Sequence, residues 1–182
     1  MTPEKYNDIR EAYIEHITDL ITDMGGLYPH VTVFADQKDP KEGEEDKPAI
    51  IHIPIPEELI DTDEGKEQFV EGILPDVFAT LKEKFIPYGV AWSSEAWMRV
   101  IDKTDKIPDN YKDLPIKKEI IIITLETSNK EEIIIYEIKR SGKQVNQFGD
   151  FIDKVELILQ PEMSTPNSMG GRFSGLFKKF KD

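Results

Sequence analysis

The chain contains no cysteine, only three histidines and only two tryptophans among its 182 residues. The absence of cysteine excludes disulfide frameworks, thiolate zinc sites and cysteine nucleophiles. The sequence also lacks a serine–histidine–aspartate pattern, so nucleophilic catalysis has little support. No apolar run approaches the roughly 20 residues that a membrane span needs, and no signal peptide precedes the first predicted helix. We therefore expect a protein without a transmembrane segment that works in a cytoplasm.

Basic residues are scarce, because 23 Lys and Arg stand against 36 Asp and Glu. The formal net charge is −13. Nucleic acid binding requires cations to neutralise phosphates, so this charge argues against nucleic acid as a partner of the main body. It favours a partner that is basic. Hydrophobic residues make up 38% of the chain, which is enough for the core of one domain.

Two amphipathic helices are predicted. The first begins at Thr2 and Pro3, a cap followed by a proline suited to the first helical position. Apolar side chains then recur at helical spacing as far as Met24, and Gly25-Gly26 ends the helix. The second helix is predicted over residues 62–85, where Pro75 kinks it or splits it in two.

Strands are predicted over residues 30–35, 49–55, 88–101, 117–126 and 131–140, with a turn at 127–130. Pro54 favours an edge position for the second strand. The unbroken isoleucine runs of the last two strands suit central strands covered on both faces. Residues 153–159 form a last strand or a helix. The fold class is therefore α+β, a single mostly antiparallel sheet with the N-terminal and central helices packed on it. A mixed α/β sandwich is the alternative.

The composition also predicts where the domain ends. Residues 1–159 form the globular domain, residues 160–171 form a linker of Pro, Ser, Asn and Gly, and residues 172–182 form a basic amphipathic tail. We expect this tail to be flexible. Because an exposed tail adds little burial, truncation after Gln160 should change the thermal stability by only a few degrees.

One candidate catalytic site combines Glu137 and Lys139 with Glu119. An E-x-K at a strand end, beside an antiparallel strand that carries an acid, resembles the metal-dependent PD-(D/E)xK nuclease core. That resemblance implies a divalent ion held by Glu119 and Glu137, with Lys139 positioning the water. The site requires Glu119 to lie opposite Lys139; if Glu119 lies opposite Ile138 instead, the two acids face opposite ways. The structural alternative to the nuclease site is that Glu119 and Lys139 form a cross-strand salt bridge at the rim of the sheet.

The other polar candidates are weaker. His30 and His52 lie on strands that pair if the hairpin forms, and His16 lies at a polar edge of the first helix. We interpret the three as ordinary surface or half-buried histidines, and we expect no metal and no cofactor. Ser93, Glu95 and Trp97 share one face of a strand and form a possible pocket.

The segment "SEAWM", residues 94–98, is followed by a polar loop, a proline and "KKEIIII". This pattern covers roughly a quarter of the chain and resembles small uncharacterised proteins of tailed phages and bacteria. The resemblance implies a phage protein in a host cytoplasm or virion, and it implies no activity.

The tail "GGRFSGLFKKF" combines apolar and basic side chains. As a helix it presents an apolar stripe beside cations, and so short a helix needs a partner to fold. The candidate binding residues are Arg172, Phe173, Leu176, Phe177, Lys178, Lys179 and Phe180. A protein groove or the protein's own acidic body is favoured as the target, and a membrane surface or nucleic acid is the alternative.

The function predicted from these features is non-enzymatic. We expect an acidic domain that binds another protein, or a second copy of itself, with the tail as a docking peptide. A phage accessory, structural or host-takeover protein fits this description. The alternatives are the metal-dependent nuclease and a DNA-mimic inhibitor, whose acids at residues 36–46 would imitate phosphates.

Overall fold

The computed structural model describes residues 2–40, 48–99, 114, 116–161 and 175–181, with the backbone alone at 116, 117 and 179–181. The helical elements are α1 (Pro3–Met24), α2 (Glu57–Ile60), α3 (Asp63–Glu67), the π-helical turn η1 (Gln68–Ile73), α4 (Leu74–Lys84) and α5 (Leu176–Lys181). The strands are β1 (His30–Gln37), β2 (Ala49–Pro54), β3 (Phe85–Arg99), β4 (Ile116–Thr127), β5 (Glu131–Val145) and β6 (Phe151–Leu159). None of the helices described is long and apolar enough to cross a membrane.

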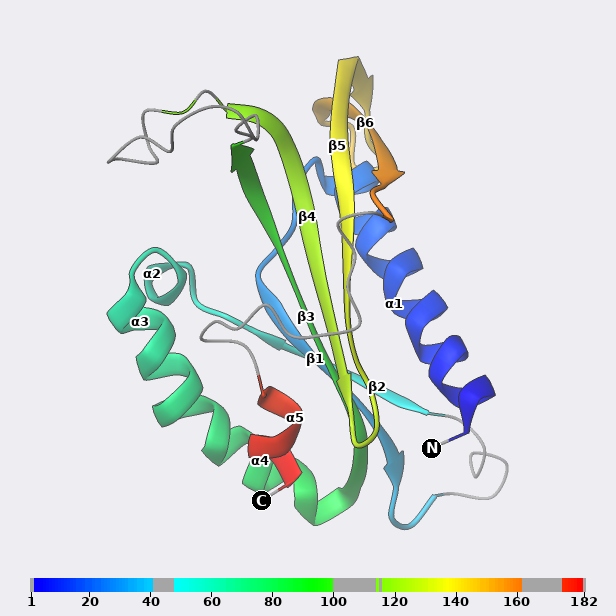
Figure 1. Cartoon of the computed structure of the whole chain (residues 1–182), viewed down its shortest axis with the longest axis vertical. Helices are drawn as coiled ribbons and strands as arrows, with labels where there is room; N and C mark the ends of the chain where they lie inside the picture. Colours follow the sequence, from blue (N-terminus) through cyan, green and yellow to red (C-terminus); the bar gives the residue numbers. More distant parts are fainter. Residues whose placement is uncertain (1, 41–47, 100–113, 115, 162–174, 182) are drawn as a thin grey trace, which may run out of the picture.

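The six strands form one antiparallel sheet in the order β2-β1-β3-β4-β5-β6, with helices on it (Figure 1). The predicted α+β class is therefore confirmed. β2 lies at one edge of the sheet, as Pro54 indicates, and β4 and β5 lie inside it. The region 153–159, which was ambiguous in the sequence, is the edge strand β6.

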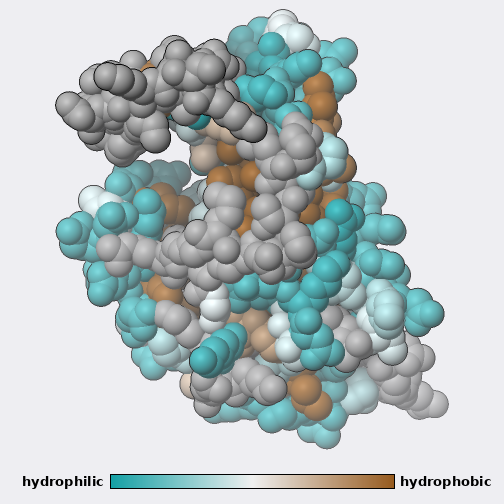
Figure 2. All heavy atoms as spheres, in the orientation of Figure 1, coloured by the Kyte–Doolittle hydropathy of each residue, from teal (hydrophilic) through white to brown (hydrophobic). Residues whose placement is uncertain are grey.

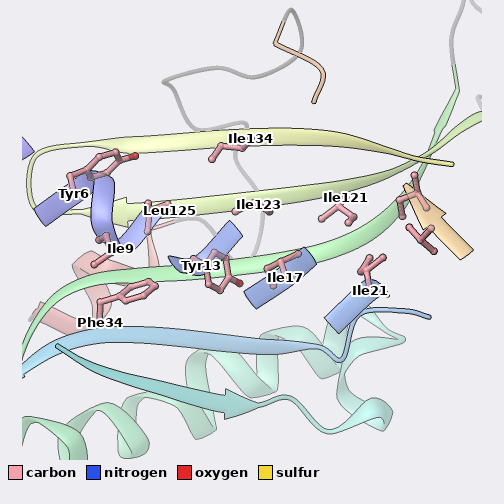
Figure 3. Close-up of a cluster of buried hydrophobic side chains, with 13 residues drawn as sticks. Tyr6, Ile9, Tyr13, Ile17, Ile21, Phe34, Ile121, Ile123, Leu125 and Ile134 are labelled. Atoms are coloured by element: carbon pink, nitrogen blue, oxygen red, sulfur yellow. The ribbon is translucent and has the colours of Figure 1, made fainter. Parts of the chain in front are cut away.

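Helix α1 covers one face of the sheet. The Thr2 hydroxyl accepts a hydrogen bond from the backbone N–H of Lys5 at 3.2 Å, and Gly25 ends the helix in the left-handed conformation at φ 79°. Figure 3 shows its buried side chains pointing at the strands. The core that they form includes Tyr6, Ile9, Tyr13, Ile17, Ile21, Phe34, Ile121, Ile123, Leu125, Ile134 and Ile138.

Helices α3 and α4 lie on the opposite face. Pro75 has no N–H to donate, and the helix widens into the π-helical turn η1 just before it. The helix predicted to be kinked or split at Pro75 therefore changes from a π-helical turn to the α-helix α4 at this point. The core beneath comprises Val31, Val33, Ala35, Ile53, Ile55, Phe69, Val70, Leu74, Phe78 and Val90. Figure 2 shows further hydrophobic surface over the middle of the sheet, with hydrophilic surface around it.

The short helix α5 completes that second core. Leu176 is 1% exposed and Phe177 is 6% exposed, and both belong to the same cluster as Phe78 and Val90. Figure 1 shows α5 between α4 and the sheet. Leu176 and Phe177 are therefore packed into the domain. The sequence had predicted that residues 172–182 form a tail separate from it.

Candidate metal centre

Three histidines from three elements meet between α1 and the β1–β2 hairpin. One nitrogen from each of the His16, His30 and His52 rings lies within 4.8 Å of the others. The His16 and His52 rings are stacked with centroids 4.3 Å apart, and His30 meets both edge-on. The β1–β2 register pairs Thr32 with His52, so His30 and His52 are diagonal neighbours on one face. The packing of α1 on that face brings His16 to them.

Hydrogen bonds orient two of the three rings. His30 Nδ1 lies 2.6 Å from the carbonyl oxygen of Tyr28, which can only accept, so Nδ1 carries the proton. Nε2 of His30 then has a free lone pair, and it is buried without a hydrogen-bond partner among the described residues. His52 Nδ1 lies 2.9 Å from the Thr32 hydroxyl. Metal-binding histidines typically have their second nitrogen held in this way.

The surroundings lower the pKa of each of the three rings. Burial lowers the pKa of His16, and the neighbouring His30 ring lowers it further. Burial also lowers the pKa of His30, against the opposing effect of its hydrogen bond to Tyr28. For His52, burial first and then the two other imidazoles lower the pKa to about 4. Because the neutral imidazole is the form that binds metal ions, these shifts favour coordination.

A cavity of about 520 Å³ opens beside the rings. Its walls come from successive turns of α1, from the segment between α1 and β1, and from the end of β2. The lining residues are His16, Leu20, Met24, Gly26, Leu27, Tyr28, His30, His52 and Pro54. The three imidazoles thus line a cavity whose other described lining side chains are mostly apolar.

The sequence predicted that His30 and His52 could face each other, and it placed His16 apart from them. The helical spacing of α1 is the pattern that places His16 on the same side. His16 follows the buried Tyr13 by three residues and precedes Leu20 by four, so it shares the face of the helix that packs on the sheet. Its meeting with the strands depends on how α1 lies on them.

The register of β4 and β5 overturns the nuclease site. Glu119 lies opposite Ile138, and Ile120 lies opposite Glu137. Glu119 and Glu137 consequently face opposite sides of the sheet, and the condition that the site required is not met. Lys139 is exposed on the face of Glu137.

The two acids form structural ion pairs instead. Glu137 pairs with Lys118 at 2.7 Å. Glu119 accepts hydrogen bonds from Nε and an Nη of Arg140, the shortest at 2.6 Å. Arg140 also donates to the carbonyl oxygen of Gly25 at 2.8 Å, which ties the end of α1 to the sheet.

Ser93, Glu95 and Trp97 share a face as predicted but occupy different environments. Ser93 is buried and accepts a hydrogen bond from the Tyr13 hydroxyl at 3.2 Å. Glu95 accepts one from the backbone N–H of Leu27 at 2.6 Å, which fixes a wall of the histidine cavity. Trp97 is 63% exposed. The described cavity includes none of the three residues themselves.

The tail residues divide between described and undescribed positions. Leu176 and Phe177 lie in the core, and Lys178 is exposed. The Glu126 carboxylate accepts hydrogen bonds from the backbone N–H groups of Gly175 and Phe177 at 2.8 and 3.0 Å. Outside the described residues lie Arg172, Phe173, the side chains of Lys179 and Phe180, and the acids at 41–46 that the DNA-mimic hypothesis uses.

No family model, curated protein or solved structure matches this chain.

Proposed function

We propose that the protein binds a divalent first-row transition-metal ion, Zn²⁺ above all, through His16, His30 and His52. The observation that carries the proposal is that three imidazoles lie together beside the buried Nε2 of His30, which has no hydrogen-bond partner among the described residues. Imidazole nitrogen suits Zn²⁺, Ni²⁺ and Cu²⁺, whereas Mg²⁺ prefers oxygen ligands. Three histidines with a fourth position open are a known arrangement for Zn²⁺.

Geometry supports coordination after a small closure. Zn–N bonds of roughly 2.0–2.1 Å place tetrahedral ligand atoms about 3.3 Å apart, and the ring nitrogens lie within 4.8 Å of each other. His30 is buried and anchored by the Tyr28 carbonyl, while His16 is half-buried and His52 is exposed. The His16 and His52 rings are stacked, so closing the site requires side-chain rotations that turn their ring nitrogens towards His30.

The charge of the molecule also supports the proposal. With a net charge of −13, the protein attracts cations to its surface. The same charge creates weak, unspecific sites at exposed carboxylates, so the experiment must separate these from the histidines. A matched acid variant serves this purpose.

The test is calorimetric titration of Zn²⁺ into the untagged chain, alongside His16→Asn, His52→Asn and Glu57→Gln. His16 and His52 are the less buried ligands, so both variants should fold, and Glu57 is an exposed acid of α2. One equivalent of tight binding is expected in the unaltered chain and in Glu57→Gln, and its loss is expected in each histidine variant. Equal binding by all four proteins would refute the proposal.

A second candidate function, binding to another protein, is favoured by the β5–β6 hairpin tip. Val145, Phe148 and Phe151 are 58%, 67% and 79% exposed there. Three hydrogen bonds to Asn146 hold the turn: the backbone N–H groups of Phe148 and Asp150 donate to its side-chain oxygen, and that of Gly149 donates to its carbonyl. Exposed aromatic side chains on an ordered turn are typical of docking surfaces.

The occupant that we propose for this tip is a basic protein, because a second copy of a chain of charge −13 would be repelled. A pull-down with the unaltered chain should recover a basic protein. That protein should be lost with the Phe148→Ser, Phe151→Ser double variant and kept with Trp97→Ser, which alters an exposed aromatic residue elsewhere. Self-association in sedimentation experiments would contradict this choice of occupant.

A further inference from the structure

We infer that the cavity beside the three histidines takes a small molecule with a carboxylate head and an apolar body, whose head occupies the fourth position of the bound metal ion. This inference rests on the proposed metal site and extends it to the class of ligand. It uses three features of the cavity: the charge left on the metal, the chemistry of the walls and the place where the cavity opens.

The charge on the metal selects the head group. His16, His30 and His52 are neutral ligands, so a divalent ion that they hold keeps its full charge. Among the described residues that line the cavity there is no carboxylate, although Asp19 acts on His16 from outside the lining and Glu95 accepts a hydrogen bond from Leu27. An anionic oxygen donor at the fourth position therefore offsets a charge that no lining side chain neutralises directly, since opposite charges attract strongly in surroundings of low polarity.

The walls select the body of the ligand. Leu20, Met24, Leu27 and Pro54 present apolar surface, and Tyr28 adds an aromatic ring. A volume of about 520 Å³ falls within the usual range for small-molecule sites, roughly 300–1,000 Å³. An alkyl or aryl group that enters this space gains free energy by leaving water.

The opening of the cavity accounts for two exposed apolar side chains. Met24 is 56% exposed and Tyr28 is 54% exposed, and both line the cavity. Exposed apolar residues beside a cavity are the surface that an apolar ligand covers when it binds. The wall between them is ordered, because the backbone N–H of Leu27 is held by Glu95. The entrance is thus apolar, and the backbone of its wall is held at Leu27.

The experiment uses the full chain loaded with Co²⁺, whose visible absorption reports both the histidine ligands and the fourth ligand. Binding of Co²⁺ is measured first, and straight-chain carboxylates from acetate to octanoate are then titrated in. We expect a saturable spectral change with each acid and a Kd that falls roughly 4-fold per added methylene until the cavity is full. Alcohols of the same lengths should leave the spectrum unchanged.

Variants identify the wall. Met24→Ala should reduce the dependence of Kd on chain length, whereas Ile86→Ala, a similarly exposed apolar residue outside the cavity lining, should not. A chain that binds Co²⁺ but shows no spectral change with any acid, or equal Kd values for acetate and octanoate, overturns the inference and leaves the metal site standing. Failure of Co²⁺ to bind at the histidines overturns both.

Discussion

At the scale of single residues, the proposed metal site depends on groups outside its three imidazoles. Thr32 is fully buried, and its hydroxyl holds Nδ1 of His52 at 2.9 Å. The Tyr28 carbonyl does the same for His30. The Tyr28 contact fixes the tautomer of His30, and both contacts reduce the freedom that the rings lose on binding.

The Thr32→Val substitution tests this dependence, because it keeps the shape of the side chain and removes the hydroxyl. We expect Zn²⁺ affinity to fall roughly 10-fold, measured by calorimetric titration. Ser93→Ala is the matched control, since it removes a buried hydroxyl that contacts Tyr13 rather than a histidine. If both substitutions weaken Zn²⁺ equally, the loss comes from general loosening of the core.

At the scale of elements, α5 is the segment whose position in the structure differs most from its predicted role. Its apolar residues were expected to bind a target, and among the candidates was the protein's own body. Leu176 and Phe177 fill the core between α4 and the sheet. The anchor is the buried carboxylate of Glu126, which accepts hydrogen bonds from the start of the segment. The helix is short, so this packing rather than helix propensity holds it.

Phe177→Ala should therefore lower the free energy of unfolding by roughly 3–5 kcal/mol, the usual cost of removing a buried phenylalanine. The exposed neighbour Lys178→Ala should change it by less than about 0.5 kcal/mol. Urea denaturation measures both. By the same argument, truncation after Gln160 should lower the melting temperature by far more than the few degrees expected of an exposed tail. Equal stability of the truncated and full chains would show that α5 contributes nothing.

The Glu126 carboxylate also gives α5 a pH dependence. Burial, the largest effect, raises its pKa above the ordinary 4.5, although the α5 N–H groups oppose the shift. A raised pKa means that the folded state holds its proton more tightly than the unfolded state. The stabilisation is therefore fully present below about pH 4.5 and is lost as the pH rises through the folded-state pKa.

We expect the stability advantage of the unaltered chain over Glu126→Gln to shrink as the pH rises above about 4.5. Melting temperatures of the two proteins at a series of pH values measure this difference. Glu58→Gln, which alters an exposed acid of α2, should show no such trend. A difference that grows with pH would mean that the hydrogen bonds from α5 outweigh the burial of the charge.

At the scale of the whole molecule, the proposed metal site would couple metal binding to folding. The three ligands come from α1, β1 and β2, so the unfolded chain cannot assemble the site. An ion that binds only the folded state stabilises it by roughly 2.7 kcal/mol at a concentration 100 times its Kd. The site thus joins the N-terminal helix to the hairpin at one edge of the sheet.

Zn²⁺ should accordingly raise the melting temperature of the full chain, whereas Mg²⁺ at the same concentration should have little effect, because Mg²⁺ prefers oxygen ligands. Scanning calorimetry with and without a chelator measures the difference. Glu137→Gln should leave the Zn²⁺ effect intact, since Glu137 pairs with Lys118 on the other face of the sheet. A larger effect of Mg²⁺ than of Zn²⁺ would point to carboxylate ligands instead.

Local patterns in the sequence were sufficient for most of the secondary structure. Thr2, Pro3 and Gly25 bound α1 because capping acts between residues a few positions apart. The isoleucine runs predicted two inner strands because burial on both faces requires apolar residues throughout. The turn at 127–130 closes through hydrogen bonds between Thr127 and Lys130.

The tertiary structure alone decided the sites. Because side chains alternate along a strand, a shift of one residue between β4 and β5 separated Glu119 from Glu137, and no local pattern fixes that register. His16 reached His30 and His52 through the packing of α1 on the sheet. Phe177 is likewise buried through contacts with residues that are distant in the sequence. Local sequence patterns determine which helices, strands and turns form. Contacts between side chains that are distant in the sequence depend on how those elements pack.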